Sequence, residues 1–119
     1  MTEDDFVFLF RKVFRNLRAF RAAYEDYGTD EIIGPGGIEL NLHDLERLYE
    51  ERHRLSRRQK EALELFLHDD VREKDVAEIM GVSKTNPVAI YATQGLRKMY
   101  RMIKSGEIAG FEDLIKERV

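Results

Sequence analysis

Residues Asp75 to Ser83 read DVAEIMGVS, and this stretch decides which fold we expect. A helix-turn-helix requires a short helix, a tight turn and a second helix whose exposed N-terminal half can enter the major groove of DNA. Ala77 is small where two such helices must cross closely, and Gly81 can adopt the positive φ that the turn requires. We therefore predict a helix-turn-helix over residues 72–104, with its first helix from about Arg72 to Met80.

The sequence on the C-terminal side of this stretch predicts one long helix from Pro87 to Lys104. Its apolar residues recur at helical spacing, and Asn86 followed by Pro87 fits an N-cap and a first-turn proline. These apolar residues are Val88, Tyr91, Ala92, Leu96, Met99 and Ile103. Ser105-Gly106 should end the helix, and a short final helix is expected over Phe111–Glu117.

The sequence on the N-terminal side predicts two further helices. Ser56 and Gln59 have the spacing of a capping box, so a helix should begin there and run to about Leu67. An earlier helix should begin after Asn41 and run to about His53. In the short helix of the motif we expect four residues to be buried, namely Val76, Ala77, Ile79 and Met80.

The first part of the chain predicts a single helix from Asp5 to Tyr27, ended by Gly28. Apolar residues alternate in steps of four and three, as along the seam of a coiled coil. We interpret this aromatic seam as core or as an oligomer or partner surface, formed by Phe6, Phe10, Val13, Leu17, Phe20 and Tyr24. Residues 29–41, which hold the glycine and proline cluster, are expected to be a loop or hinge.

Composition favours a folded, water-soluble, all-α helical bundle. Of the 119 residues, 43% are hydrophobic and 36% are charged, a balance that does not suggest disorder. The absence of cysteine excludes disulfides and thiolate metal sites. The longest apolar run is too short to span a bilayer and the N-terminus is acidic, so we expect a cytoplasmic protein in a bacterium or a phage-infected cell, without membrane association.

The charge is unevenly distributed along the chain. The net charge is −3, yet residues 82–104 contain five Lys or Arg and no acid. Binding to nucleic acid depends on the local patch more than on the total charge.

Three blocks of sequence in fixed order resemble the fourth region of primary-type bacterial sigma factors and related phage regulators. They are LSRRQKEALELFL, DVAEIMGVS and GLRKM, within Leu55–Arg101. In that family the last helix reads the promoter −35 element and nearby surfaces contact RNA polymerase, so the resemblance implies double-stranded DNA and RNA polymerase as partners. It places the base-reading surface on Lys84, Thr85, Asn86, Ala89, Ile90, Thr93 and Gln94. It assigns phosphate contacts to Arg57, Arg58, Arg97, Lys98 and Arg101. The segment between Ser83 and Leu96 is one residue longer than the family pattern, which predicts an extended turn.

The leading hypothesis is thus a sequence-specific transcription regulator. A DNA-packaging recognition subunit of the small-terminase kind also joins a helix-turn-helix to an oligomerising helical segment, and a third hypothesis is a protein that docks on polymerase without reading DNA. In all three cases the aromatic seam would support a homo-oligomer. The three histidines are scattered, and Ser56 and Ser83 are better explained as caps than as nucleophiles. We therefore expect no enzyme, no metal site and no cofactor.

Overall fold

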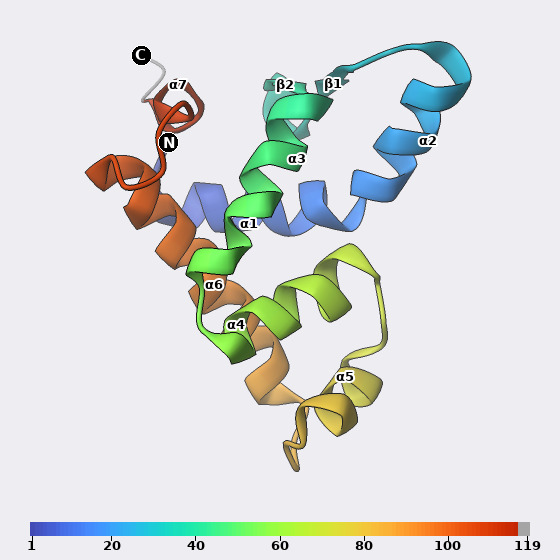
Figure 1. The fold of residues 1–119 in the computed structure, drawn as a ribbon, viewed down its shortest axis with the longest axis vertical. Coiled ribbons are helices and arrows are strands. Elements are labelled where there is room, and N and C mark those ends of the chain that lie inside the picture. The colour runs from blue at the N-terminus through green and yellow to red at the C-terminus, as the bar shows by residue number, and fades with distance from the viewer. Residues whose placement is uncertain (117–119) are drawn as a thin grey trace.

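The computed structural model describes residues 1–116, which form the expected all-α helical bundle together with one small β-hairpin (Figure 1). In chain order the elements are α1 (Glu3–Arg15), α2 (Leu17–Tyr27), β1 (Glu31–Ile33), the 3₁₀ turn η1 (Pro35–Gly37), β2 (Glu39–Asn41), α3 (Leu42–Glu50), the 3₁₀ turn η2 (Glu51–Arg54), α4 (Arg57–Ala62), the π-helical turn η3 (Leu63–His68), α5 (Glu73–Met80), α6 (Asn86–Ser105) and α7 (Glu112–Ile115).

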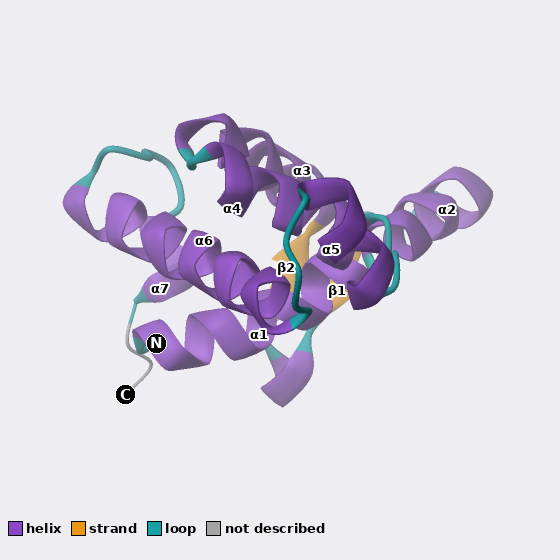
Figure 2. Cartoon of the chain, turned by 90° about the horizontal axis from the view of Figure 1, so that it is seen from below, coloured by secondary structure: helices purple, strands orange, loops and turns teal. Residues whose placement is uncertain are grey.

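The long helix α6 is the centre of the structure. It packs against α1, α4, η3, α5 and α7, and Figure 2 shows α1 and α4 on two sides of it. The buried residues form one cluster that extends from Phe6 in α1 to Phe111 at the start of α7. Most of the chain therefore shares a single core, and α1 is part of it.

The N-terminal segment is two helices, which corrects the prediction of one continuous helix. Asn16 has φ −99° and ψ 5°, outside helical geometry, and its side-chain amide donates a hydrogen bond of 2.8 Å to the Lys12 carbonyl. Asparagine competes with the helix backbone in this way, so it favours helix ends. As a result α2 turns away from α1 and projects from the body of the molecule (Figure 1).

The aromatic seam is mostly an internal surface, which corrects its interpretation as an oligomer interface. Phe6, Phe10, Val13 and Leu17 are buried within the chain itself. The ring centroids of Phe6 and Phe10 lie 4.3 Å apart, and Phe6 also contacts Tyr100 of α6 at 5.6 Å. The last two residues of the seam, Phe20 and Tyr24 on α2, are only partly buried.

The expected hinge is an ordered β-hairpin. Strands β1 and β2 pair antiparallel, with Ile32 opposite Leu40, and the side chains of both residues are buried. Gly34 lies against α1, because a Cβ atom built on it would come within 3.5 Å of Leu9 Cδ1. The glycine and proline residues thus form the tip of a hairpin that packs on the core, where the sequence had suggested a flexible connection.

Several helix ends agree with the sequence. Ser56 and Gln59 form the predicted capping box, and the Asn41 side chain accepts hydrogen bonds from the backbone at the start of α3. One burial prediction on α5 is wrong, since Ile79 is exposed. The final helix covers only Glu112–Ile115, and the expected end at Glu117 lies outside the described residues.

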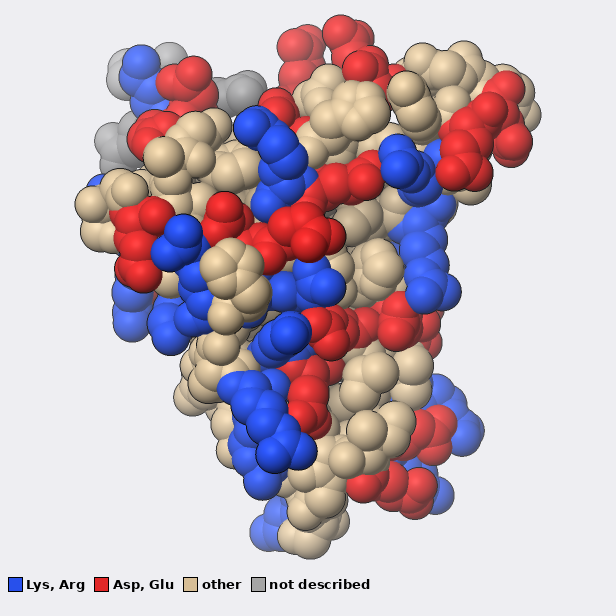
Figure 3. All heavy atoms as spheres, viewed as in Figure 1, with Lys and Arg blue, Asp and Glu red and all other residues tan. Residues whose placement is uncertain are grey.

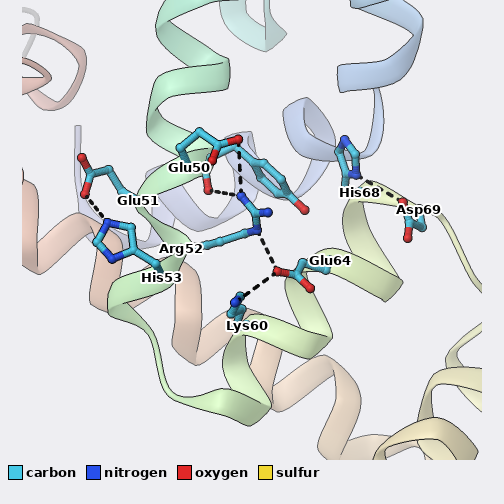
Figure 4. A network of polar contacts seen from close by, with 9 residues as sticks. Glu50, Glu51, Arg52, His53, Lys60, Glu64, His68 and Asp69 are labelled. Carbon is cyan, nitrogen blue, oxygen red and sulfur yellow. Dashed lines mark hydrogen bonds and ion pairs between the residues drawn. The ribbon is translucent and has the colours of Figure 1, made fainter.

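A polar network joins the first half of the chain to the helices around the motif (Figure 4). Arg52 of η2 donates to Glu64 of η3 at 2.8 Å and to the Tyr49 carbonyl at 3.2 Å. The Arg52 guanidinium also lies over the Tyr49 ring, 4.2 Å from its centroid. Burial raises the pKa of the Tyr49 hydroxyl above its ordinary value.

Candidate nucleic-acid interface

The predicted helix-turn-helix segment is built from α5, a five-residue turn and the first half of α6. Gly81 ends α5 with φ 71°, and the Val82 N–H donates to the Ala77 carbonyl at 3.0 Å. An L-residue with a side chain rarely adopts this backbone conformation, which explains the glycine. The helix α6 begins at Asn86, with Thr85 as N-cap, one residue earlier than predicted.

The first half of α6 has one buried face and one exposed face. Val88 and Ala92 are fully buried, whereas Asn86, Ile90 and Gln94 are exposed. At 100° per residue these three side chains fall on one stripe of the helix. Ile90 is 52% exposed, so this stripe presents an aliphatic side chain between two amides.

The remaining residues predicted to read bases flank this stripe. Lys84 and Thr85 are exposed in the turn, and Ala89 and Thr93 are half-buried along the edge of the stripe. The structure therefore brings all seven predicted base-reading residues to one end of the molecule, around the start of α6.

Of the two arginines of α4, Arg58 lies nearer to the turn. Its guanidinium donates to the Met80 carbonyl at 3.4 Å and lies 5.8 Å from the ring centroid of Tyr91 in α6. Arg57 is largely exposed and pairs with Glu61 of its own helix at 2.9 Å. Tyr91 is a residue that the sequence reasoning assigned only to the core, although it also supports Arg58.

Arg97 and Arg101 are held by carboxylates of α1. Arg97 pairs with Asp4 at 2.8 Å and with Glu3 at 3.1 Å, and Arg101 pairs with Glu3 at 2.7 Å. The hydrogen bond with Asp4 raises the pKa of Arg97, and the bond with Glu3 acts in the same direction. Carboxylates of α1 therefore already neutralise part of the charge that either arginine could offer to a phosphate. Lys98, by contrast, forms no ion pair within residues 1–116.

This arrangement changes the expected charge of the site. The acid-free stretch that the sequence showed in residues 82–104 is partly neutralised in space by the first turn of α1. In the sequence, Glu3 and Asp4 stand out only as part of an acidic N-terminus. The sequence held one signal for this pairing, since Arg97 and Arg101 are four residues apart and therefore lie on one face of α6.

The end of the molecule formed by the motif carries both signs of charge. Figure 3 shows basic side chains over α4 and acidic ones over α5. The acids of α5 include Glu73, Asp75 and Glu78, of which Asp75 pairs with Arg72 at 3.0 Å. The basic side of the site is therefore the one formed by α4, the turn and α6.

Residues 1–116 show neither a cluster of metal ligands nor a membrane-spanning helix. Among residues 1–116, no three His, Asp or Glu side chains are grouped so as to hold a metal ion. None of the described helices combines the length and the apolar character needed to cross a bilayer. Comparison of the chain with protein-family models, curated proteins and solved structures finds no significant match.

Proposed function

We propose that this protein is a transcription regulator that binds duplex DNA by inserting the first half of α6 into the major groove. The observation that carries the proposal is the exposed stripe of Asn86, Ile90 and Gln94 at the start of α6, directly after the Gly81 turn. Asparagine and glutamine can bind adenine through two hydrogen bonds, and an aliphatic side chain can contact the thymine methyl group. This stripe thus offers chemistry for reading base edges.

The surroundings of the stripe supply candidates for phosphate contacts. We reassign Lys84 from base reading to phosphate contact, because it is exposed in the turn before α6. Arg58 lies beside the end of α5, and Lys98 is exposed further along α6. The first turn of α6 contains no acid, so the positive end of its helix dipole is not opposed there. Cations placed around a reading surface fix the position of the protein on the duplex without specifying its sequence.

We further propose RNA polymerase as a second partner, a role that rests only on the resemblance of residues 55–101 to the sigma family. The small-terminase alternative joins a helix-turn-helix to an oligomerising helical segment. No observation favours it here, because Phe6, Phe10, Val13 and Leu17, which were expected to form such a segment, are buried within the chain. A pull-down with polymerase, without measurable binding to any duplex, would instead favour a docking protein that does not read DNA.

Selection of bound sequences from a pool of random duplexes tests the proposal. We expect an enriched motif that is lost, or changed at one or two positions, in the variant Ile90→Ala with Gln94→Ala. Lys84→Ala should weaken binding to all sequences alike and reduce the salt slope of the affinity by about 1.

The matched control is Lys104→Ala, which removes the same charge from the opposite end of α6. Enrichment of no motif would contradict sequence-specific recognition. Equal effects of Lys84→Ala and Lys104→Ala would contradict the assignment of the reading surface to the start of α6.

A further inference from the structure

The first two helices carry a second basic stretch of the chain. Residues 6–24 contain five Lys or Arg and no acid, the same local charge as residues 82–104. The two cations nearest its C-terminal end are held in ion pairs with acids of other elements. The other three, Arg11, Lys12 and Arg15 of α1, form no ion pair in the described part of the chain. Their charge is therefore available to a partner.

Arg15 is held in position while its hydrogen-bond donors stay free. Its guanidinium lies over the ring of Phe66 in η3, 4.7 Å from the centroid, and Phe66 belongs to the buried core. The exposed Arg15 side chain donates no hydrogen bond to any other group of residues 1–116. A guanidinium that stacks on an aromatic ring can still bind a phosphate through two of its N–H groups. Arg15 thus presents positioned donors without an acceptor from its own chain.

The side of α1 that bears Arg11 and Arg15, here called the basic flank, borders α6. Asp4, Arg11 and Arg15 are spaced seven and four residues apart, so they project from one side of α1. At one end of this side Asp4 pairs with Arg97 of α6 at 2.8 Å, and at the other end Arg15 lies on η3, which itself packs against α6. The basic flank therefore lies between a contact with α6 and a contact with η3.

The ion pairs also show which face of α6 the basic flank borders. Arg97 follows Asn86 by eleven residues, and Arg101 follows Ile90 by the same number. Eleven residues are close to three full turns of a helix. Both arginines therefore continue the exposed stripe that begins at Asn86, and α1 meets α6 on the side of that stripe.

A helix inserted in the major groove has a phosphate backbone on each side of it, because two backbones bound the groove. Figure 2 shows α4 on one side of α6 and α1 on the other. Arg58 belongs to the α4 side, where it lies beside the end of α5. On the α1 side, Arg97 and Arg101 are already balanced by carboxylates, so the surplus positive charge is that of the basic flank.

From this arrangement we propose that the basic flank, Arg11 and Arg15 of α1, binds phosphates of duplex DNA on the side of α6 opposite α4. The duplex would then be held between α4 and α1, with the start of α6 in its major groove. Two such contacts would position the reading helix without specifying sequence. This inference rests on the proposed function and adds α1 to the DNA-binding surface.

The full chain can be tested by fluorescence anisotropy with a labelled duplex of mixed sequence, titrated at a series of salt concentrations. The variant Arg11→Gln with Arg15→Gln should bind on the order of tenfold more weakly, and its salt slope should fall by about 2, because two phosphate contacts are lost. Selection from random duplexes should return the same motif as for the wild type, since phosphate contacts carry no sequence information.

Two further variants separate charge from packing and from position. Arg11→Lys with Arg15→Lys keeps both charges, so its salt slope should stay within about 0.5 of the wild type. The matched control, Arg47→Gln with Lys104→Gln, removes two cations from the last turns of α3 and α6, and its slope should stay within the same limit of about 0.5.

The outcomes distinguish this inference from the proposed function. If the wild type binds no duplex, the proposed function fails and this inference fails with it. If Ile90→Ala with Gln94→Ala changes the selected motif but Arg11→Gln with Arg15→Gln leaves the salt slope unchanged, only this inference is overturned. Equal losses of slope in the control would also overturn it. So would binding to anionic lipid vesicles that the Arg11→Gln, Arg15→Gln variant loses while its DNA binding is unchanged, since a membrane would then be the partner of the basic flank.

Discussion

The side chain of Phe10 allows the clearest test of whether the aromatic seam belongs to the core of a single chain. Phe10 is 0% exposed, stacks on Phe6 at 4.3 Å and meets Phe14 edge-on at 5.4 Å. Truncating a buried phenylalanine to alanine costs about 3–5 kcal/mol, through lost transfer free energy and the cavity left behind. Natural domains have only about 5–15 kcal/mol of stability, so Phe10→Ala should remove a large share of it.

The same helix contains a matched control. Phe8 is 61% exposed, and Lys12 lies 4.0 Å from its ring centroid. Phe8→Ala removes the same atoms as Phe10→Ala, yet it should change the free energy of unfolding by about 0.5 kcal/mol or less, as most surface substitutions do.

Urea denaturation followed by circular dichroism gives both free energies, and a thermal scan should show a decrease in Tm of about 10–20 °C for Phe10→Ala. Sedimentation velocity then reports whether either variant changes its association state. The assignment of Phe10 to the intramolecular core would be refuted if Phe10→Ala kept its stability while an oligomer of the wild type dissociated.

Three further predictions follow from particular contacts. The double variant Glu3→Gln with Asp4→Asn should free Arg97 and Arg101 of α6, so that DNA affinity rises and its salt slope increases by about 1–2. As a control, removing the same number of acids from the end of α2 should not increase the slope. A Cβ atom added at Gly95 would lie 3.2 Å from Leu63 Cδ1, and a branched side chain would overpack this helix crossing. In urea denaturation, Gly95→Ala should therefore leave the free energy of unfolding within about 1 kcal/mol of wild type, while Gly95→Val should cost about 1–3 kcal/mol. Hydrogen bonds from the backbone and then from the hydroxyl of Thr2 lower the pKa of the Asp5 carboxyl below its ordinary value. The stabilising effect of Asp5 is therefore present above the unfolded-state pKa and is lost as the pH falls through the lower folded-state pKa. Asp5→Asn should flatten the fall in the free energy of unfolding at acidic pH, and an unchanged fall would count against the capping box.

Much of the local structure could be predicted because its causes are local. The capping box of Ser56 and Gln59, the N-cap at Asn41 and the turn at Gly81 each depend on hydrogen bonds or backbone angles within a few residues. The exposed face at the start of α6 also follows from helical spacing, since its buried residues repeat with a period of about 3.6.

Predictions that depended on a partner far along the chain were less successful. The regular spacing of apolar residues near the N-terminus correctly predicted a buried surface. The same spacing, however, fits packing against a second chain and packing within one chain equally well. Ile79 shows the same limit, because its apolar character predicted burial and the packing of α5 leaves it in solvent.

The helix-turn-helix segment was determined largely by the sequence alone, through Gly81, the small Ala77 and the regular apolar positions of α6. Only the tertiary structure decided what surrounds it. It brings α1 against α6, buries Phe10 and places Glu3 on Arg97, across more than ninety residues of chain. The physical reason is the distance along the chain over which each interaction acts. Turns and caps are satisfied by neighbouring backbone groups. Burial and ion pairing instead depend on which distant surfaces meet when a single core closes.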